Sequence, residues 1–392
     1  MPGLPRRRWI PLAWRNLTEH PWRLAAYLAG TSFAVVLMMT ELGFRNALLD
    51  NMVAVIRALD GELFVINRER YVVSEPVRFP LRRVETARGV DGVASVCPFY
   101  LETEGTAWRN AADGLPRKIR VGAYRPDDDL INLPEVRALR AEWDRADAAL
   151  ADRRSKADTF GPLGAGTATE LQGRSIRVVG RFTLGTDFRN NGTLVMSERN
   201  LFHYFPERLG TTRGEDLVDV GVVRLRPGSD PEAVRSAIEA RLPADVRVLT
   251  RAELMAKERR FWENVAPIGV VFDVGLVMGF IVGMAICYQV LFSEIADRLG
   301  QFATLKAMGY TERTLRGYVV REGVDLALLG YAAGLVVSLG LFRALQELTG
   351  MDVGLYPADL AAVLVLTVLM CVVSGALAAR RLTTVDPADL FG

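Results

Sequence analysis

The chain carries few residue patterns that could bind a nucleotide or hydrolyse a bond. A phosphate-binding loop places a lysine directly after a glycine, so that backbone amides and the lysine hold the phosphates together. None of the lysines in this chain follows a glycine. No serine lies in a Gly-x-Ser-x-Gly elbow, and His20 and His203 are far apart in the sequence. We therefore expect no catalytic, metal-binding or cofactor-binding residues, and a chain that is not an enzyme by itself.

Five charged residues lie inside or at the ends of long apolar stretches: Glu41, Asp273, Arg321, Glu322 and Asp325. Ionisable groups inside a membrane often mark a proton or ion path. All five, however, fall within about two or three helical turns of the end of a stretch, where snorkelling or a shifted boundary accounts for them. An ion relay is therefore the minor alternative.

A second group of residues has the chemistry of a docking surface. Four apolar residues recur at a spacing of three: Leu299, Phe302, Leu305 and Met308. This spacing puts an apolar stripe along one face of a short helix. Gly309 stands where a helix usually ends, and Thr311 is suited to cap the next one. A short helix beside a membrane with a bare apolar face needs a partner, so we interpret it as a docking helix for a separate protein.

The elements that must position this helix are membrane spans. Half of the 392 residues are hydrophobic, too many for an ordinary soluble protein and too few for one entirely within a membrane. A stretch of about 20 apolar residues crosses the hydrocarbon core. We expect spans at 23–44, 266–292, 317–342 and 359–379, an outer domain at 45–265, a coupling loop at 293–316 and a short outer loop at 343–358. The predicted fold class is an α-helical membrane protein with four transmembrane helices and a large α+β periplasmic domain inserted between helices 1 and 2.

The distribution of arginine and lysine sets the orientation. Basic residues cluster before the first span, between the second and third, and after the fourth. We therefore place both termini, the coupling loop and the tail at 380–392 in the cytoplasm. Residues 1–22 combine three tryptophans with arginines, as in a helix lying in the membrane interface, with a merely basic leader as the alternative. A net charge of +2 gives no support for nucleic-acid binding.

The outer domain contains two strand–helix–strand patterns. They lie at 62–66, 81–87 and 93–106, and at 220–225, 231–241 and 246–249. Both ends of the domain should therefore build one α+β subdomain. We expect 127–200 to be an inserted subdomain, with a helix at 135–153 and strands at 174–182 and 192–197. Helical periods at 44–59 and 251–265 predict two stalk helices that carry the domain.

Glycines recur every four residues in two spans. They are Gly275, Gly279 and Gly283 in the second span and Gly330 and Gly334 in the third. Small residues at this spacing let helices approach closely in lipid. These glycines could serve packing within one subunit or a dimer interface, and the sequence does not decide between the two.

The order of these elements resembles the MacB/FtsX-like class of ABC transporter permeases. The segment SEIADRLGQFATLKAMGYTERTLRGYVVREG at 293–323 is similar to the coupling region of that class, and the tail RRLTTVDPADLFG is similar to its end. The stretches LAWRNLTEHPWRL, ELGFRNALLDN and ATLKAMGY further resemble the DevC-type permeases of glycolipid-export systems.

The resemblance implies partners and a mechanism. Two copies would form a homodimer in the bacterial inner membrane and bind a dimer of a separate cytoplasmic ABC ATPase, which holds ATP and Mg. The residues that couple to the ATPase would be those of the apolar stripe and their neighbours in the loop. They are Glu294, Arg298, Leu299, Phe302, Leu305, Lys306, Met308 and Gly309. A periplasmic membrane-fusion adaptor and a TolC-like outer-membrane channel would complete an exporter that transmits motion, with a (glyco)lipid as the cargo that this branch suggests.

Two alternatives use the same architecture. An FtsX-like signal transmitter would use ATPase-driven motion to activate a periplasmic cell-wall hydrolase, although such regulators have a smaller outer domain. A lipoprotein-release permease would pair two different permeases.

Overall fold

The computed structural model describes residues 21–187, 189–210, 216–265, 268–298, 300–301, 304–305, 308–349 and 353–380. The predicted interfacial segment at 1–22 and the tail at 380–392 therefore lie almost entirely outside the described residues. The chain divides into two compact units. The membrane unit holds the chain up to Asn46 and most of it from Gly269 onward, and the sheet unit holds Ala47–Ile268.

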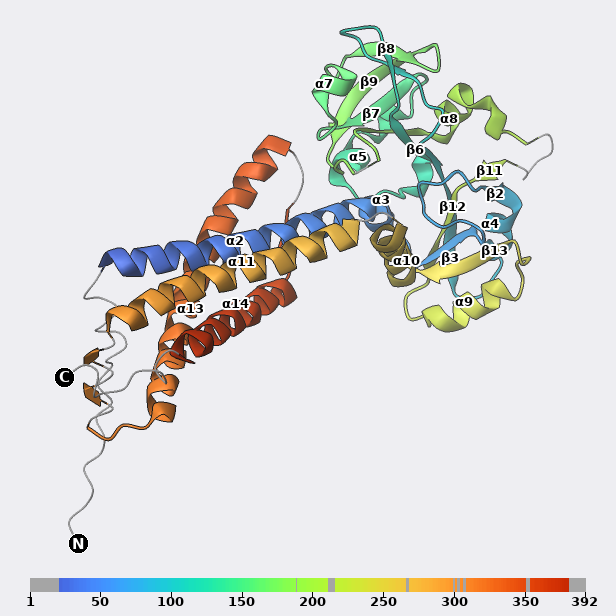
Figure 1. The fold of residues 1–392 in the computed structure, drawn as a ribbon. Helices are drawn as coiled ribbons and strands as arrows, with labels where there is room; N and C mark the ends of the chain where they lie inside the picture. The colour runs from blue at the N-terminus through green and yellow to red at the C-terminus, as the bar shows by residue number, and fades with distance from the viewer. Residues whose placement is uncertain are drawn as a thin grey trace. The chain divides into compact units, whose positions relative to one another are not determined.

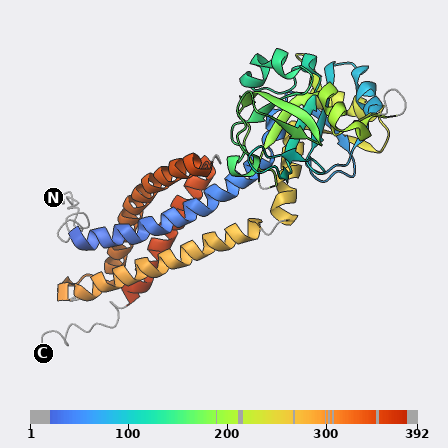
Figure 2. The same cartoon turned by 90° about the horizontal axis from the view of Figure 1, so that it is seen from above.

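Four long helices form the membrane unit (Figures 1 and 2). They are α2 (Pro21–Met52), α11 (Ile268–Asp297), α13 (Glu312–Thr349) and α14 (Pro357–Ala378). Each contains a stretch long and apolar enough to cross a membrane. The predicted fold class, four such helices with an α+β domain between the first and the second, is thereby confirmed.

Two of these helices are longer than the predicted spans. Helix α2 runs on to Met52 and is followed directly by α3 (Ala54–Ala58). Helix α13 has 38 residues, and at 1.5 Å per residue it is about 57 Å long, far more than the roughly 30 Å of hydrocarbon. Its first residue follows Thr311, whose Oγ1 accepts from the backbone N–H of Thr314 at 3.4 Å, as expected for the helix cap.

The two strand–helix–strand patterns of the sheet unit are confirmed. The first is β1 (Leu63–Asn67), α4 (Leu81–Arg88) and β3 (Val93–Glu102), and the second is β12 (Val220–Leu225), α9 (Pro231–Glu239) and β13 (Val246–Thr250). Their strands pair in the antiparallel order β13-β1-β12-β3, with the first strand of each pattern at the centre. This is the split βαβ arrangement of ferredoxin-like domains.

The segment predicted as an inserted subdomain, 127–200, extends the same sheet together with the preceding residues 108–124. Strands β4 (Trp108–Arg109), β5 (Pro116–Arg117), β6 (Arg120–Tyr124), β7 (Ala148–Asp152), β8 (Ala168–Leu171), β9 (Arg174–Phe182) and β10 (Thr193–Ser197) continue it in the order β3-β6-β10-β7-β9-β8-β4-β5. Residues of 127–200 share both main hydrophobic clusters with the rest of the unit. The prediction of a separate subdomain therefore differs from the structure, because β6 joins the two halves through hydrogen bonds to β3 and β10.

The helix predicted at 135–153 is wrong over its second half. The structure has α5 (Pro134–Ala138), α6 (Arg140–Trp143) and then the fully buried strand β7, which pairs with β9 and β10. The alanines of β7 favour a helix in isolation, but two neighbouring strands supply its hydrogen bonds. The predicted strands at 174–182 and 192–197 correspond to β9 and β10.

Short elements complete the sheet unit. They are β2 (Phe79–Pro80) paired with β11 (Leu217–Val218), α7 (Ala157–Phe160), α8 (Glu198–Tyr204), and the 3₁₀ turns η1 (Pro126–Asp128) and η2 (Pro206–Arg208).

Strand β1 is buried on both faces of the sheet. Leu63 and Val65 belong to the cluster that α4 and α9 cover, and Phe64 and Ile66 belong to the cluster that contains residues of α3 and of α10 (Arg251–Val265). Side chains alternate between the faces of a strand, so a run of four apolar residues requires cover on both sides. The ends of the two stalk helices provide that cover on one side (Figure 1).

A buried ionic cluster fixes the end of β12. The carboxylate of Asp219 lies 2.7 Å from Arg70 and 2.8 Å from Arg208, and it accepts from the backbone N–H of Leu101 at 2.8 Å. All three charged side chains are essentially inaccessible. Burial by itself would raise the pKa of Asp219, but Arg208 and Arg70 outweigh it and hold the pKa below its ordinary value.

Replacing Asp219 with Asn should destabilise the sheet unit strongly. The change leaves the buried guanidinium of Arg70 without its counterion, while Arg208 keeps its ion pair with Glu102. Breaking a buried pair in this way costs about 3–5 kcal/mol. We expect a clear fall in the thermal unfolding midpoint of the intact chain in detergent, measured by loss of protease resistance. Asp245→Asn is the control, because the pair of Asp245 with Arg83 is partly exposed and should contribute about 1 kcal/mol or less.

Candidate coupling site

The charged residues predicted for coupling face the membrane unit itself. Glu294 and Arg298 form an ion pair at 3.1 Å at the end of α11, and Arg298 also lies 4.0 Å from Glu322 of α13. The three side chains are mostly buried, with exposed fractions of 18%, 14% and 6%. These residues therefore tie the start of the loop to α13, which can position a docking surface without belonging to it.

The apolar residues of the predicted stripe have different surroundings. Leu305 is half-buried and packs against the apolar cluster of the membrane unit, whereas the side chain of Met308 is 63% exposed. The helical turn closes with a hydrogen bond from Met308 to Thr304, and Gly309 then adopts a φ of +94°, a conformation that favours glycine. Leu299, Phe302 and Lys306 lie outside the described residues. Met308 is thus the described member of the stripe that is available to a partner.

The remaining charges predicted near span ends also have neighbours within the membrane unit. Arg45 of α2 forms an ion pair with Asp273 of α11 at 3.3 Å, and Glu41 lies against Gly275. Asn46 donates to Asp359 at the start of α14 at 2.6 Å. These contacts hold the ends of helices together, as expected for residues near a membrane boundary.

The glycines of both patterned spans face helix α2 of the same chain. A Cβ at Gly275 would come within 2.4 Å of Glu41, and one at Gly279 within 3.3 Å of Met38. Gly283 lies against Ala34 and against Met370 of α14. On α13, a Cβ at Gly330 would meet Thr31 at 2.5 Å, and one at Gly334 would meet Val35 at 2.7 Å. Close packing within one subunit therefore explains the absence of side chains at these positions.

The two stalk helices are joined within the sheet unit. Arg259 of α10 forms an ion pair with Asp50 near the end of α2, and Trp262 packs in one buried cluster with Leu49. At the other end of α10, the guanidinium of Arg251 donates to the carbonyls of Arg57 at 3.1 Å and Gly61 at 2.7 Å. The end of α2, α3 and α10 therefore form one connected support for the sheet.

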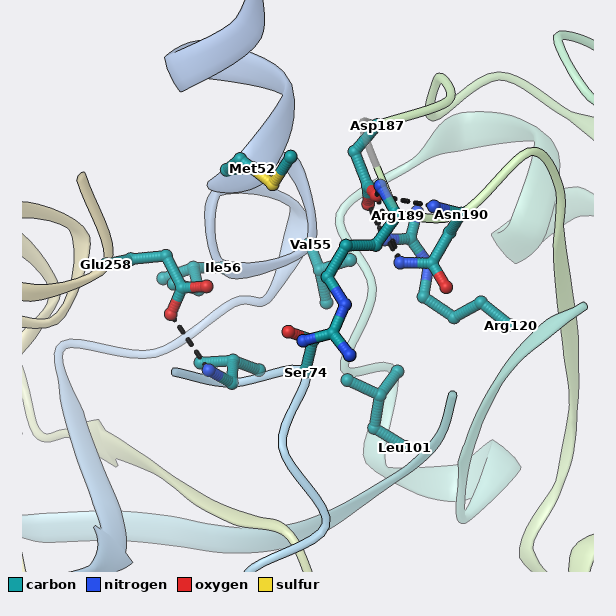
Figure 3. Close-up of a pocket in the computed structure, with 11 residues that line it drawn as sticks. Met52, Val55, Ile56, Ser74, Leu101, Arg120, Asp187, Arg189, Asn190 and Glu258 are labelled. Carbon is teal, nitrogen blue, oxygen red and sulfur yellow. Dashed lines mark hydrogen bonds and ion pairs between the residues drawn. The ribbon is translucent and has the colours of Figure 1, made fainter. Parts of the chain in front are cut away.

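Glu258 of α10 lies within this support, at the edge of a small cavity (Figure 3). Its carboxylate accepts from the backbone N–H of Val73 at 2.8 Å and from the indole N–H of Trp262 at 3.1 Å. The adjoining cavity is lined by Met52, Ile56 and Arg120 among others and measures about 20 Å³, room for about one water molecule. Burial raises the pKa of Glu258 from 4.5 to about 7, although the two N–H donors favour the charged form.

Sequence reasoning missed both buried ionic sites. Glu258 stands beside Lys257, Arg259 and Arg260, and such a run of charges usually indicates a solvated helix face. Asp219 is one acidic residue between two apolar stretches. Its partner Arg70 lies 149 residues away in the chain, so no spacing in the sequence marks the cluster.

Comparisons with known proteins find sequences similar to the membrane part of the chain. Residues 274–387 match the family described as FtsX-like permease C-terminal. Uncharacterized ABC transporter permeases from two strains of Mycobacterium tuberculosis are each 31% identical over 116 residues, which is 30% of this chain and 32% of theirs. The match thus spans about a third of the length of those relatives.

The chain is also similar to solved structures at low identity, and we name one of them. It is the extracellular domain of the noncanonic ABC-type transporter YknZ from Gram-positive bacteria, at 15% identity and a TM-score of 0.33, covering 48% of this chain and 98% of that domain. This similarity concerns the fold alone.

The buried carboxyl of Glu258 should make stability depend on pH. Between pH 4.5 and 7 the unfolded chain loses the proton that the folded chain keeps, so the free energy of unfolding falls as the pH rises through this window. Glu258→Gln should remove this loss, and its stability relative to the original chain should rise by about 1–3 kcal/mol between pH 5 and pH 8. Denaturant unfolding of the intact chain at both values measures it. Glu253→Gln is the control on the same helix, since the backbone N–H of Thr250 holds the pKa of Glu253 below its ordinary value.

Substituting a close-packed glycine should disrupt the membrane unit. Gly330→Leu forces a side chain into Thr31 of α2, and overpacking of this kind typically costs about 1–3 kcal/mol. Gly340→Leu on the same helix is the matched control, because a Cβ there has no described atom within 4 Å. We expect a lower thermal midpoint in detergent for the first variant only. Equal midpoints would contradict the assigned packing of α13 on α2.

Proposed function

We propose that this chain, whose residues 274–387 match an FtsX-like permease domain, is the membrane subunit of an ATP-driven exporter that transmits motion. A separate cytoplasmic ATPase docks on the loop between α11 and α13. Its closure on ATP and Mg moves the membrane helices, and the stalks carry that motion to the sheet unit. The chain itself supplies neither the nucleotide site nor the hydrolytic chemistry.

The observation that carries the proposal is the continuity of the stalk. Helix α2 is one element from Pro21 to Met52 and belongs to both units, and α3 follows it after the single turn residue Val53. Val55 and Ile56 of α3 are part of the core under the sheet. A helix transmits displacement along its axis because its backbone hydrogen bonds run in that direction. A movement of the first span is therefore delivered to the core of the sheet unit.

The remaining parts of the proposed exporter follow from the resemblance to DevC-type permeases. Two copies of the chain pair in the inner membrane, with both termini and the 293–316 loop in the cytoplasm and the sheet unit in the periplasm. The sheet unit works with a membrane-fusion adaptor and a TolC-like channel. The cargo of this class is a (glyco)lipid.

Met308→Asp should abolish docking of the ATPase while leaving the fold intact. The side chain is exposed, so a carboxylate is tolerated in the free chain but is buried without a partner when an apolar groove closes over it. The measurement is affinity purification of the intact chain in mild detergent with mass spectrometry of the co-purified proteins. We expect at least a tenfold loss of the ATPase, since a buried unpaired charge costs more than 1.4 kcal/mol.

Gln301→Asp is the matched control, because Gln301 is exposed, polar and in the same loop. It should retain the ATPase. Leu305→Asp is less informative, since Leu305 also packs on the membrane unit. Full docking by Met308→Asp would refute the assigned face, and an original chain that captures no ATPase would refute the exporter. Capture of a cell-wall hydrolase in place of an adaptor would instead support a signal transmitter.

A further inference from the structure

An open pocket lies beside helix α10 of the sheet unit. It measures about 490 Å³ and is lined by Tyr71, Lys257, Arg260, Phe261 and Asn264, together with Glu253 and Ala256. This volume is within the range of about 300–1,000 Å³ that is typical of small-molecule sites. It is much larger than the cavity beside Glu258.

The pocket carries two cations that lack an anionic partner. The ammonium of Lys257 donates to the backbone carbonyls of Arg70 and Tyr71, the latter at 2.6 Å. Within the described part of the chain, neither Lys257 nor Arg260 forms an ion pair. The one acid in the lining, Glu253, is already bound by Arg235 at 2.9 Å and by the backbone N–H of Thr250. The pocket is therefore positively charged and open to an anion.

The electrostatic surroundings of Lys257 agree with this reading. Partial burial, and after it the nearby charge of Arg247, lower the pKa of Lys257 to about 8. The charges of Glu258 and Glu75 offset part of this lowering. A bound anion would favour the charged ammonium further.

The other wall of the pocket is aromatic. The side chain of Tyr71 is 65% exposed, and its ring centre lies 6.3 Å from that of Phe261, which is half-buried. A ligand for this pocket needs both an anionic group and an apolar part beside it. A free inorganic anion would leave the aromatic wall in water.

The lining residues that α10 contributes are close in the sequence to a membrane-spanning stretch. Only four residues separate Asn264 from Gly269, where the apolar stretch of α11 opens. Residues so close to a span are within reach of the head-group layer, which is several ångströms thick. The molecules at highest concentration there that combine an anionic group with an apolar part are phospholipids.

We propose that this pocket binds the head group of an anionic phospholipid. The phosphate lies between Lys257 and Arg260, and the glycerol and the first acyl carbons lie against Tyr71 and Phe261. The site rests on the membrane location of the chain and not on docking of an ATPase, so it and the proposed exporter can fail separately.

Lys257 itself reports binding, because a phosphate bound to its ammonium blocks acylation. The intact chain is reconstituted in nanodiscs of phosphatidylcholine alone or with phosphatidylglycerol, and treated with an amine-acylating reagent. The labelling rate of each lysine is followed by mass spectrometry, with exposed Lys118 as the internal reference. Phosphatidylglycerol should slow labelling of Lys257 by about fivefold or more relative to Lys118, since only the unbound fraction reacts.

Two variants separate a specific site from the general effect of a charged bilayer. Arg260→Gln removes half of the phosphate site and should abolish the protection, whereas Arg82→Gln removes an exposed charge from α4 and should preserve it. Protection that survives Arg260→Gln, or equal rates in both kinds of nanodisc, would overturn the proposal. Equal protection by inorganic phosphate in phosphatidylcholine nanodiscs would overturn the assignment to a lipid.

Discussion

The packing of the stalk ends on the second face of the sheet is the contact on which the rest of the molecule depends. Strand β1 has apolar side chains in both directions, and a sheet with two apolar faces is stable only when both are covered. Helices α4 and α9 cover one face, and α3 and α10 cover the other. The support helices are therefore part of the hydrophobic core and not an attachment to a finished domain. Moving them without the sheet would expose that core to water.

Two kinds of polar contact reinforce this arrangement, and they differ in how fully the buried charge is compensated. The cluster around Asp219 is fully paired, and every charged group in it has an opposite charge or a backbone donor within hydrogen-bond distance. Glu258 accepts from two N–H donors, but burial outweighs these donors and the nearby charges of Lys257 and Arg70 and raises its pKa. The first cluster ties together the segments that contain Arg70, Leu101 and Asp219. The second is a weak point at the junction of the two stalks.

The membrane unit is held by a different physical principle. Water is absent there, so burial of apolar surface gives helices little reason to associate, and close packing takes its place. The glycines of α11 and α13 bring both helices against α2, which is therefore at once the centre of the membrane packing and the stalk of the sheet unit. Ion pairs such as Arg45 with Asp273 and Arg298 with Glu322 lie near the ends of the helices.

The sequence by itself determined the features that depend on local periodicity and composition. These features are the four apolar helices, the two strand–helix–strand patterns, the cap at Thr311 and the turn at Gly309. Each depends on the hydrophobic period or the backbone preference of residues that are neighbours in the sequence. It also predicted the glycine stripes but not what they face. Only the tertiary structure decided which helix they face, since the spacing of glycines predicts close helix packing but does not identify the partner helix.

The tertiary structure also overrode local preference at β7 and joined the predicted insertion to the main sheet. It brought Arg70 against Asp219, which lies 149 residues further along the chain. It also turned Leu305 toward the membrane unit while Met308 stayed exposed. Each of these outcomes rests on contacts between residues far apart in the chain. Their energy comes from desolvation and packing, which no stretch of sequence contains on its own.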